Sequence, residues 1–358
     1  MDFTLSSERR VALSAGVAPF FAGKRVLVTG AGGSVGSAVT ASLAELDCAK
    51  LILLDHFDHD LLDIVERAGA VAGRDRVTDI LCDIRDFELL SGAIARAKPD
   101  IVIHAAALKH VHLGERHPAQ CILTNLIGAR NVLKASVSAG AGHFLLISTD
   151  KAAEPVCVMG ASKRLAELYL TGFQRERPSA TVMKSVRFGN VFASQGSVVP
   201  RFAAQIEASS PLEVTHPDMR RYFMSIEDAV ALILNVAALE EEGAASGCYY
   251  MDMGDLVSIA DLARDMVARS GKNIPIKYTG LRPGEKLREV LFDDYEIASP
   301  CALEDVHRVT PASPQAYVTS ADLMQLEALA SSGDDELIRR RVFAYLDARL
   351  GRDEPAAG

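Results

Sequence analysis

Short apolar runs alternate with amphipathic stretches through the first half of the chain. The apolar residues within these runs are continuous rather than alternating, which predicts strands buried on both faces, as in a parallel sheet covered by helices. The predicted fold class is therefore α/β, a doubly wound parallel sheet whose ligands bind at the carboxyl ends of the strands. The expected strands are residues 25–29, 50–54, 77–82, 99–104, 143–148 and 181–187.

The pattern changes after Gly189, where prolines divide the chain into short segments. Such punctuation predicts a smaller, loop-rich lobe attached to the main domain. Helical periodicity returns within and beyond this lobe. Helices are expected at residues 37–46, 226–239 and 259–270, with one or two more in 320–350 and another packed on the domain at 11–22.

The composition is that of a folded, acidic protein. Of 358 residues, 49% are apolar and 24% are charged, and 38 basic against 47 acidic residues leave a net charge of −9. This balance argues against nucleic acid as a partner, because phosphates are neutralised by clustered Lys and Arg. The six cysteines form no C-x-x-C pair, which predicts reduced thiols in a cytoplasmic protein. The apolar stretch at 11–22 is too short to cross a bilayer, so we expect no membrane segment.

A glycine-rich turn follows the first expected strand and opens a helix. It reads Thr29-Gly-Ala-Gly-Gly-Ser-Val-Gly36. Glycines at this place let the backbone approach a pyrophosphate, and the helix N-terminus favours the negative charge. We therefore predict a dinucleotide site, with a ligand-free tight turn as the alternative. The binding residues expected in this turn are Gly30, Gly33, Ser34, Val35 and Gly36.

Residues at the ends of the next strands extend this prediction. Asp55 ends the second expected strand, about 20 residues after the glycine turn. A carboxylate there accepts both ribose hydroxyls and repels a 2′-phosphate, so we predict NAD rather than NADP; helix capping is the alternative. Asp83 and Ile84 follow the third strand and are expected to face the adenine. Ala105 and Ala106 follow the fourth strand, where small side chains leave room for the cofactor.

The run from Asp55 to Asp60 contains His56 and His59, which raises the question of a metal site. A metal site on a helix typically has two histidines one helical turn apart and a third ligand nearby, and this run lacks that arrangement. We interpret the run as the polar start of a helix and predict no metal.

Reactive side chains follow the fifth expected strand, where a doubly wound fold places its chemistry. Asp150 and Lys151 stand there in Ser148-Thr-Asp-Lys151, with an exposed, salt-bridged turn as the alternative. Farther along, Met159 and Lys163 lie one helical turn apart and share a face. In short-chain dehydrogenases this pair is Tyr and Lys, and the ammonium lowers the phenol pKa for proton transfer. Methionine carries no proton, so the sequence departs from that pattern.

Several motifs together match one family, at residues 29–36, 107–111, 148–151, 158–163, 187–191, 196–200, 219–224 and 281–287. The chain resembles the nucleotide-sugar 4,6-dehydratases of the Rossmann-type extended short-chain dehydrogenase class, and in particular the UDP-N-acetylglucosamine 4,6-dehydratases of bacterial polysaccharide biosynthesis. Met159 is similar to the subgroup that retains configuration at C5, whereas the inverting subgroup has tyrosine. Many retaining relatives have an N-terminal membrane region, so the chain resembles their catalytic portion.

The resemblance implies a hydro-lyase that converts a UDP-N-acetylhexosamine to a 4-keto-6-deoxy sugar nucleotide. NAD oxidises C4, the ketone acidifies the C5 proton, water leaves across C5 and C6, and the hydride returns to C6. The implied roles are Thr149 at the C4 oxygen, Lys151 as C5 base and Asp150 as C6 acid. The last two roles are open to exchange, and Asp150 at C4 in place of Met159 is a further alternative. As base and acid, Lys151 needs a lowered pKa and Asp150 a raised one. Lys163 is expected to bind the nicotinamide ribose.

The resemblance also places the nucleotide sugar in the second lobe. Arg221 and Arg282 offer forked donors for phosphate oxygens, and Glu285 can accept ribose hydroxyls. Two further candidates come from the main domain. For Lys109 the alternative is a solvated lysine, and for Asn125 it is a helix cap. The substrate-binding residues that we expect are Lys109, Asn125, Asn190, Gly196, Ser197, Val198, Arg221, Arg282 and Glu285.

Two other functions stay open at this point. An NAD-dependent 4-epimerase uses the same C4 ketone but needs no C5 base, and Met159 also suggests a non-catalytic sensor of NAD or nucleotide sugar. By analogy with the class we expect a homodimer through helices at 118–139 and 161–175. The arginines at 339–341 are expected to be a solvated face.

These expectations divide the chain into four parts. They are an N-terminal extension (1–22), an NAD-binding domain (23–190, with 225–255 returning to it), a nucleotide-sugar lobe (191–224 and 256–305), and a C-terminal helical segment with a frayed tail (306–358).

Overall fold

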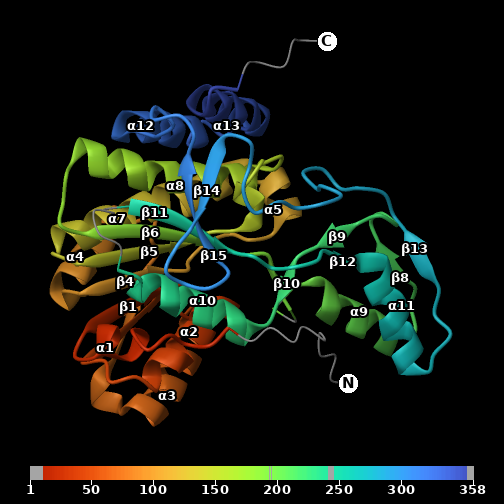
Figure 1. The fold of residues 1–358 in the computed structure, drawn as a ribbon, viewed down its shortest axis with the longest axis horizontal. Helices are drawn as coiled ribbons and strands as arrows, with labels where there is room; N and C mark the ends of the chain where they lie inside the picture. The colour runs from red at the N-terminus through yellow and green to blue at the C-terminus, as the bar shows by residue number, and fades with distance from the viewer. Residues whose placement is uncertain (1–10, 193, 195, 241–245, 353–358) are drawn as a thin grey trace.

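A nine-stranded sheet runs through the centre of the described residues, which are 11–192, 194, 196–240 and 246–352 of a computed structural model (Figure 1). Its strands are β1 (Arg25–Thr29), β2 (Lys50–Asp55), β3 (Val77–Leu81), β4 (Ile101–His104), β5 (His143–Ile147), β6 (Val182–Arg187), β11 (Ser246–Met251), β14 (Glu296–Pro300) and β15 (Val306–Pro311). Parallel pairing joins them in the order β3-β2-β1-β4-β5-β6-β11, and β15 and β14 add antiparallel strands beyond β11. The doubly wound α/β fold that the sequence predicts is confirmed.

All six expected strands are present, with bounds that differ from the prediction by two residues or fewer. Full burial is wrong for β3, because this strand lies at the edge of the sheet and Leu81 is 60% exposed. β11, β14 and β15 are further strands that were not expected from the sequence. β11 places residues 246–251 in the main sheet.

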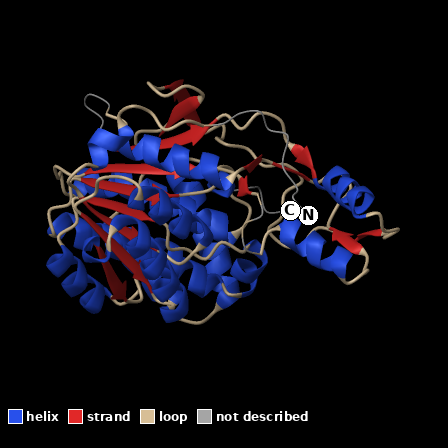
Figure 2. Ribbon diagram, turned by 90° about the horizontal axis from the view of Figure 1, so that it is seen from below, coloured by secondary structure: helices blue, strands red, loops and turns tan. Residues whose placement is uncertain are grey.

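Helices cover both faces of the sheet and close one apolar core on each (Figure 2). One layer is α1 (Val17–Phe21), α2 (Ser34–Ala44), α3 (Asp58–Ala72) and α10 (Ile226–Ala238). The other is α4 (Phe87–Ala97), α7 (Ala129–Ser138), α8 (Val158–Glu176), α12 (Ser320–Ala330) and α13 (Asp335–Leu350). Shorter helical turns join them: η1 (Arg74–Arg76), α5 (Val111–Arg116), α6 (Pro118–Cys121), the π-helix η2 (Ile122–Gly128) and η3 (Asp150–Ala152).

Two expected helices differ most from the structure, and the helix expected at 37–46 is found at Ser34–Ala44. The expected helix at 11–22 is reduced to α1, and residues 1–10 lie outside the described part of the chain. The expected helical stretch 320–350 divides into α12 and α13 near Gly333, which has a φ of +75°. Left-handed backbone of this kind ends a helix at little cost only in glycine. The predicted tail at 353–358 is also outside the described residues.

A smaller lobe lies beside the sheet, on the side where β6 ends (Figure 1). Its own apolar core is built around Phe202, Leu212 and Met266. The chain enters it through β7, directly after β6, so the lobe faces the carboxyl ends of the parallel strands. Its elements are β7 (Asn190–Val191), α9 (Val198–Glu207), β8 (Leu212–Val214), β9 (Arg220–Arg221), β10 (Phe223–Met224), β12 (Val257–Ser258), α11 (Ile259–Ser270) and β13 (Ile276–Tyr278).

The C-terminal helices α12 and α13 cover α8, η2 and α6 of their own chain. The approach is close at Gly172, where a Cβ would lie 1.8 Å from the Val318 carbonyl oxygen. Arg339 on α13 forms an ion pair with Glu115, with 3.2 Å between Nε and Oε2. The expected homodimer through 118–139 and 161–175 stays a prediction, and α12 and α13 cover part of the surface of α6, η2 and α8. The prediction that 339–341 is a solvated face is wrong for Arg339.

Within the described residues, no helix has both the length and the apolar character that a membrane span requires.

Candidate active site

The glycine turn packs tightly against the end of β4 and the start of α2. Gly30 has a φ of +67°, and a Cβ on it would lie 2.6 Å from the Ala106 backbone nitrogen. A Cβ on Gly36 would lie 2.0 Å from the Gly30 carbonyl oxygen. Ser34 and Val35 form the first turn of α2, where backbone N–H groups have no partner within the helix. The turn therefore leaves bare backbone at a helix N-terminus, as a pyrophosphate site requires.

Asp55 stands beside this turn at the end of β2. It is 7% exposed, and its carboxylate accepts hydrogen bonds from the backbone N–H of Gly32 (3.0 Å) and His56 (2.8 Å). Helix α3 begins at Asp58 with Phe57 as its N-cap, so Asp55 is not the capping residue. Among the described residues no group of three or more His, Cys, Asp or Glu side chains is arranged to hold a metal ion.

The expected adenine side of the site is formed by the segment after β3. The Asp83 carboxylate is paired with the Arg85 guanidinium at 2.5 Å, and this pairing lowers the pKa of Asp83. Ile84 is buried against Gly128, where a Cβ would lie 2.5 Å from the Ile84 Cδ1. The backbone N–H of Ala105, directly after β4, donates a hydrogen bond to the Thr29 carbonyl at 3.0 Å.

The reactive side chains expected after β5 lie together in a buried turn, η3. Asp150 is 0% exposed. Its Oδ1 accepts hydrogen bonds from the Thr149 hydroxyl and from the Lys151 ammonium, each at 2.9 Å. Its Oδ2 is buried and has no hydrogen-bond partner among the described residues. Asp150 and Lys151 are therefore a buried pair and not the exposed turn that was their alternative.

Two further side chains surround the Lys151 ammonium. The Oε1 of Glu289 lies 3.5 Å from Lys151 Nζ and 3.6 Å from the Nε of Arg221. The Oδ1 of Asn190 accepts a hydrogen bond from the same ammonium at 3.4 Å. Burial lowers the pKa of Lys151, but Asp150 and Glu289 outweigh it, and the pKa is raised. The lowered pKa that the sequence analysis required of Lys151 is therefore wrong for this state, because two carboxylates flank the amine.

Helix α8 begins against this turn. A Cβ on Gly160 would lie 2.2 Å from the Lys151 carbonyl oxygen, so only glycine permits the approach. Met159 and Lys163 are both buried on α8, each 4% exposed. Burial lowers the pKa of Lys163 to about 8, although Glu167 opposes the shift. His104 at the end of β4 is neutral because burial, and then the charge of Lys163, lower its pKa to about 3.

Lys163 makes stability depend on pH in a direction that can be checked. Its ordinary pKa is 10.5, so between pH 8 and 10.5 the folded protein binds fewer protons than the unfolded chain. The free energy of unfolding should then rise across this range, by up to about 3 kcal/mol. Lys163→Met should be more stable than wild type at pH 7, and its free energy of unfolding should lack this rise between pH 8 and 10.5. Urea unfolding of nucleotide-free protein measures both. Lys277→Met, at an exposed position, should keep the rise; equal pH dependence of Lys163→Met and wild type would contradict the burial argument.

Asn125 is fully buried in η2 rather than open to substrate. Its side chain accepts a hydrogen bond from the Leu108 backbone N–H (2.7 Å) and donates to the Leu108 carbonyl (3.0 Å) and the Ser162 hydroxyl (3.0 Å). It therefore ties the segment after β4 to α8. Lys109 is exposed in that segment and does not line the pocket of the smaller lobe.

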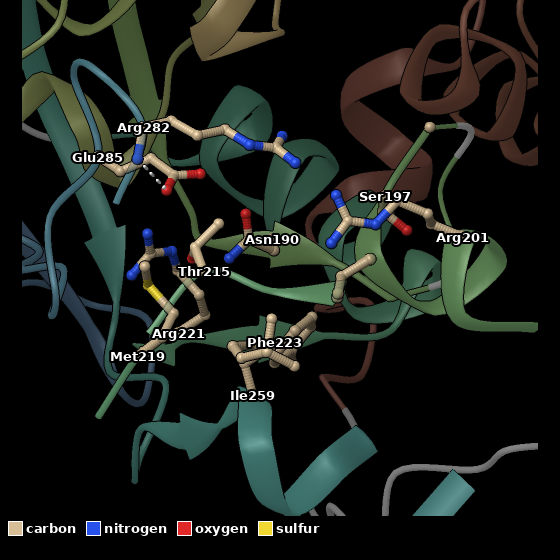
Figure 3. Close-up of a pocket in the computed structure, with 13 residues that line it drawn as sticks. Asn190, Ser197, Arg201, Thr215, Met219, Arg221, Phe223, Ile259, Arg282 and Glu285 are labelled. Carbon is tan, nitrogen blue, oxygen red and sulfur yellow. Dashed lines mark hydrogen bonds between the residues drawn. The ribbon is translucent and has the colours of Figure 1, made fainter. Parts of the chain in front are cut away.

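A pocket opens in the smaller lobe, and its lining begins at Asn190, directly after the main sheet (Figure 3). It contains seven of the nine expected substrate-binding residues; Lys109 and Asn125 are the two outside it. The lining residues are Asn190, Gly196, Ser197, Val198, Arg201, Val214, Thr215, Met219, Arg221, Phe223, Ile259, Arg282 and Glu285.

Cationic side chains converge in this pocket. The guanidinium groups of Arg201 and Arg282 point toward each other in Figure 3. Burial, and next the charge of Arg282, lower the pKa of Arg201. Ser197 is the N-cap of α9, and its hydroxyl is buried with no partner among the described residues. Two facing cations, a free hydroxyl and a helix N-terminus together favour an anion such as a phosphate.

Sequence reasoning missed two charged residues of this region. Arg201 lies one helical turn after Ser197, a spacing that could have indicated a shared face. Glu289 follows the motif at 281–287 by two positions, but nothing in that spacing indicates that it reaches Lys151.

The glycine turn, the carboxylate at the end of β2 and the Lys163 helix make this an extended short-chain dehydrogenase fold. The X-ray structure of Pen from Bacillus thuringiensis is similar, with a TM-score of 0.74 and 27% identity over 88% of this chain and 99% of that chain. DesIV, a dTDP-glucose 4,6-dehydratase from Streptomyces venezuelae solved with NAD and TYD bound, has a TM-score of 0.66 and 22% identity over 75% of this chain and 88% of that one.

The chain belongs to the family described as polysaccharide biosynthesis protein, whose model matches residues 26–311. It is 37% identical to the capsular polysaccharide biosynthesis protein CapD of Staphylococcus aureus over 88% of this chain and 52% of that protein, so it spans about half the length of this relative. It is 34% identical to a UDP-glucose 4-epimerase of Rickettsia canadensis over 81% of this chain and 83% of the relative. It is 32% identical to an inverting UDP-N-acetylglucosamine 4,6-dehydratase of Campylobacter jejuni over 87% of this chain and 89% of the relative. One of these relatives is thus described as a nucleotide-sugar epimerase and one as a nucleotide-sugar dehydratase.

Proposed function

We propose that the protein is an NAD-dependent lyase that removes water from UDP-N-acetylglucosamine and forms a 4-keto-6-deoxy sugar nucleotide. The observation that carries this proposal is the Asp150–Lys151 pair after β5, since elimination across C5 and C6 needs an acid and a base at one site. The Campylobacter jejuni relative described as a 4,6-dehydratase supports the same reaction class.

NAD fits the residues beside β1 and β2. Gly30 and Gly36 permit the tight packing of the turn on neighbouring backbone at the start of α2, and Asp55 offers a carboxylate for the ribose hydroxyls. Gly33, Ser34 and Val35 complete the cradle, and Lys163 approaches the nicotinamide side. When bound, NAD would supply the oxidation at C4 and the reduction at C6.

Asp150 and Lys151 divide the proton transfers between them. Because the pKa of Lys151 is raised, its ammonium is the proton donor to the departing C6 hydroxyl. Asp150, whose carboxylate accepts a hydrogen bond from that ammonium, is then the base at C5. This order reverses the first assignment made from the sequence. Thr149, next to Asp150, holds the C4 oxygen by a hydrogen bond.

The pocket of the smaller lobe holds the nucleotide. Arg201, Arg221 and Arg282 supply donors for the diphosphate, together with the Ser197 hydroxyl at the start of α9. Glu285 accepts the ribose hydroxyls, and its position is held by the Arg282 backbone N–H, 3.1 Å from Oε2.

Met159 bears on the stereochemistry of the product. A buried methionine at this position of α8 leaves no phenol near Lys163 to transfer a proton. By the family resemblance we propose that configuration at C5 is retained, which the ring proton couplings in the NMR spectrum of the product would decide.

The test is to incubate the protein with UDP-N-acetylglucosamine and no added oxidant, and to follow the product by mass spectrometry and NMR. A C6 methyl group and the loss of one water are expected. The alternative is a 4-epimerase, which the Rickettsia canadensis relative favours; an intact C6 hydroxymethyl with inverted C4 would identify it. An unchanged substrate with each of several UDP- and dTDP-sugars would contradict both.

A further inference from the structure

Glu289 is a buried acid that neither the sequence analysis nor the roles above account for. It lies between the motif at 281–287 and β14 and is 3% exposed. One of its carboxylate oxygens lies between the Lys151 ammonium and the Arg221 guanidinium, at 3.5 Å and 3.6 Å. The other oxygen is buried without a hydrogen-bond partner among the described residues. A carboxylate is retained in such a place only when neighbouring cations stabilise it.

We propose that Glu289 is a positioning residue that holds the Lys151 side chain in its proton-carrying place and links it to Arg221 of the nucleotide pocket. The inference rests on the proposed dehydration, because it concerns the proton that Lys151 gives to the sugar. Arg221 lines the pocket, whereas Lys151 belongs to the turn after β5, and Glu289 is the side chain that contacts both.

The charges around Lys151 determine how this bridge acts on the Lys151 ammonium. The groups that face the ammonium are Asp150 from its own turn, Glu289 from the segment before β14, and Arg221 from β9; Cys157, the N-cap of α8, is also near enough to interact with it. The two carboxylates favour the ammonium and Arg221 disfavours it. When a phosphate pairs with Arg221, the positive charge of Arg221 is neutralised. The Glu289 carboxylate then interacts mainly with the Lys151 ammonium. Substrate binding therefore secures the proton on Lys151 before water is expelled.

The matched variants are Glu289→Gln, Glu289→Asp and Glu154→Gln. Gln keeps the shape of the side chain and removes its charge, and Asp tests rescue by a shorter carboxylate. Glu154 is the control because it belongs to the same region and pairs with Lys286 at 3.6 Å, but its side chain is 47% exposed.

The readout is the pH profile of UDP-N-acetylglucosamine dehydration. In Glu289→Gln the alkaline limb of kcat should move down by about one pH unit, since an opposite charge at this distance shifts a pKa by one unit or more. At pH 7.5 kcat should fall by about 10- to 100-fold while KM changes little. Glu289→Asp should restore the wild-type limb in part, and Glu154→Gln should match wild type. An unshifted limb, or a raised KM with unchanged kcat, would overturn the proposal.

A second measurement separates this inference from the proposed reaction. In protein labelled with 15N-lysine, the Nζ resonance missing from Lys151→Met identifies Lys151, and its titration is followed in the absence of substrate. Lys151 should titrate at lower pH in Glu289→Gln than in wild type. If wild type dehydrates no nucleotide sugar but this shift is present, the proposed reaction fails and the positioning role stands. If dehydration is observed and the shift is absent, only the positioning role fails.

Discussion

Lys151→Met should lose about 10³-fold in the rate of dehydration and still exchange the C5 hydrogen of UDP-N-acetylglucosamine with solvent. The reason is that Lys151, as the proton donor, acts at C6, whereas the base at C5 is Asp150, which this variant keeps. A missing general acid costs about 10²- to 10⁴-fold. The measurement is NMR of the substrate recovered from D₂O, in which deuterium at C5 without a C6 methyl product is expected.

Asp150→Asn should give the complementary result, with neither exchange at C5 nor product. The opposite pattern, exchange in Asp150→Asn and none in Lys151→Met, would restore the assignment of Lys151 as base. Asp63→Asn and Lys277→Met make the same chemical changes at exposed positions and should behave as wild type.

Arg187→Met should destabilise the protein by about 3–5 kcal/mol. Arg187 is 0% exposed and forms ion pairs with Glu167 at 2.6 Å and with Glu296 at 2.8 Å. Arg164 is the second cation of this buried cluster and pairs with the same two carboxylates. Removal of one guanidinium leaves two buried carboxylates with a single cation, and their charge is then uncompensated. Denaturant unfolding at pH 7 measures the loss.

Arg67→Met is the control, because Arg67 pairs with Asp63 on an exposed face of α3 and should contribute no more than about 0.5 kcal/mol. The pH dependence gives a second check. Burial raises the pKa of Glu296, but Arg187 and Arg164 outweigh burial and lower this pKa from 4.5 to about 2. Its contribution to stability is then complete above pH 4.5 and is lost as the pH falls through about 2, a dependence that Arg187→Met should weaken. A loss at pH 7 as small as that of the control would contradict the argument.

The cluster also shows why the ends of the strands are held firmly. The Ser148 hydroxyl, one residue before Thr149, donates a hydrogen bond to Glu167 on α8 at 2.5 Å. Arg187 at the end of β6 donates to the Leu291 carbonyl at 3.1 Å, two residues beyond Glu289. The buried charges therefore join the turn after β5, helix α8 and the segment that contains Glu289.

Local patterns in the sequence were enough for the parallel core of the fold. Continuous apolar runs identified β1, β2, β4, β5 and β6 because a strand buried on both faces needs apolar residues at every position. β14 and β15 escaped notice because they are mixed in polarity and pair antiparallel at the other end of the sheet, where one face is less covered. The exposed face of β3 was missed for a related reason, because the sequence of one strand does not show whether that strand lies at the edge of the sheet.

The sequence alone determined the doubly wound sheet, the glycine turn of the dinucleotide site and the place of Asp150 and Lys151 after a strand, because each depends on neighbours along the chain. Only the tertiary structure decided the state of Lys151, the bridge through Glu289 and the covering of α8 by α12 and α13. These features join residues that are far apart in the sequence, and a pKa or a covered face depends on which charges and surfaces folding brings together.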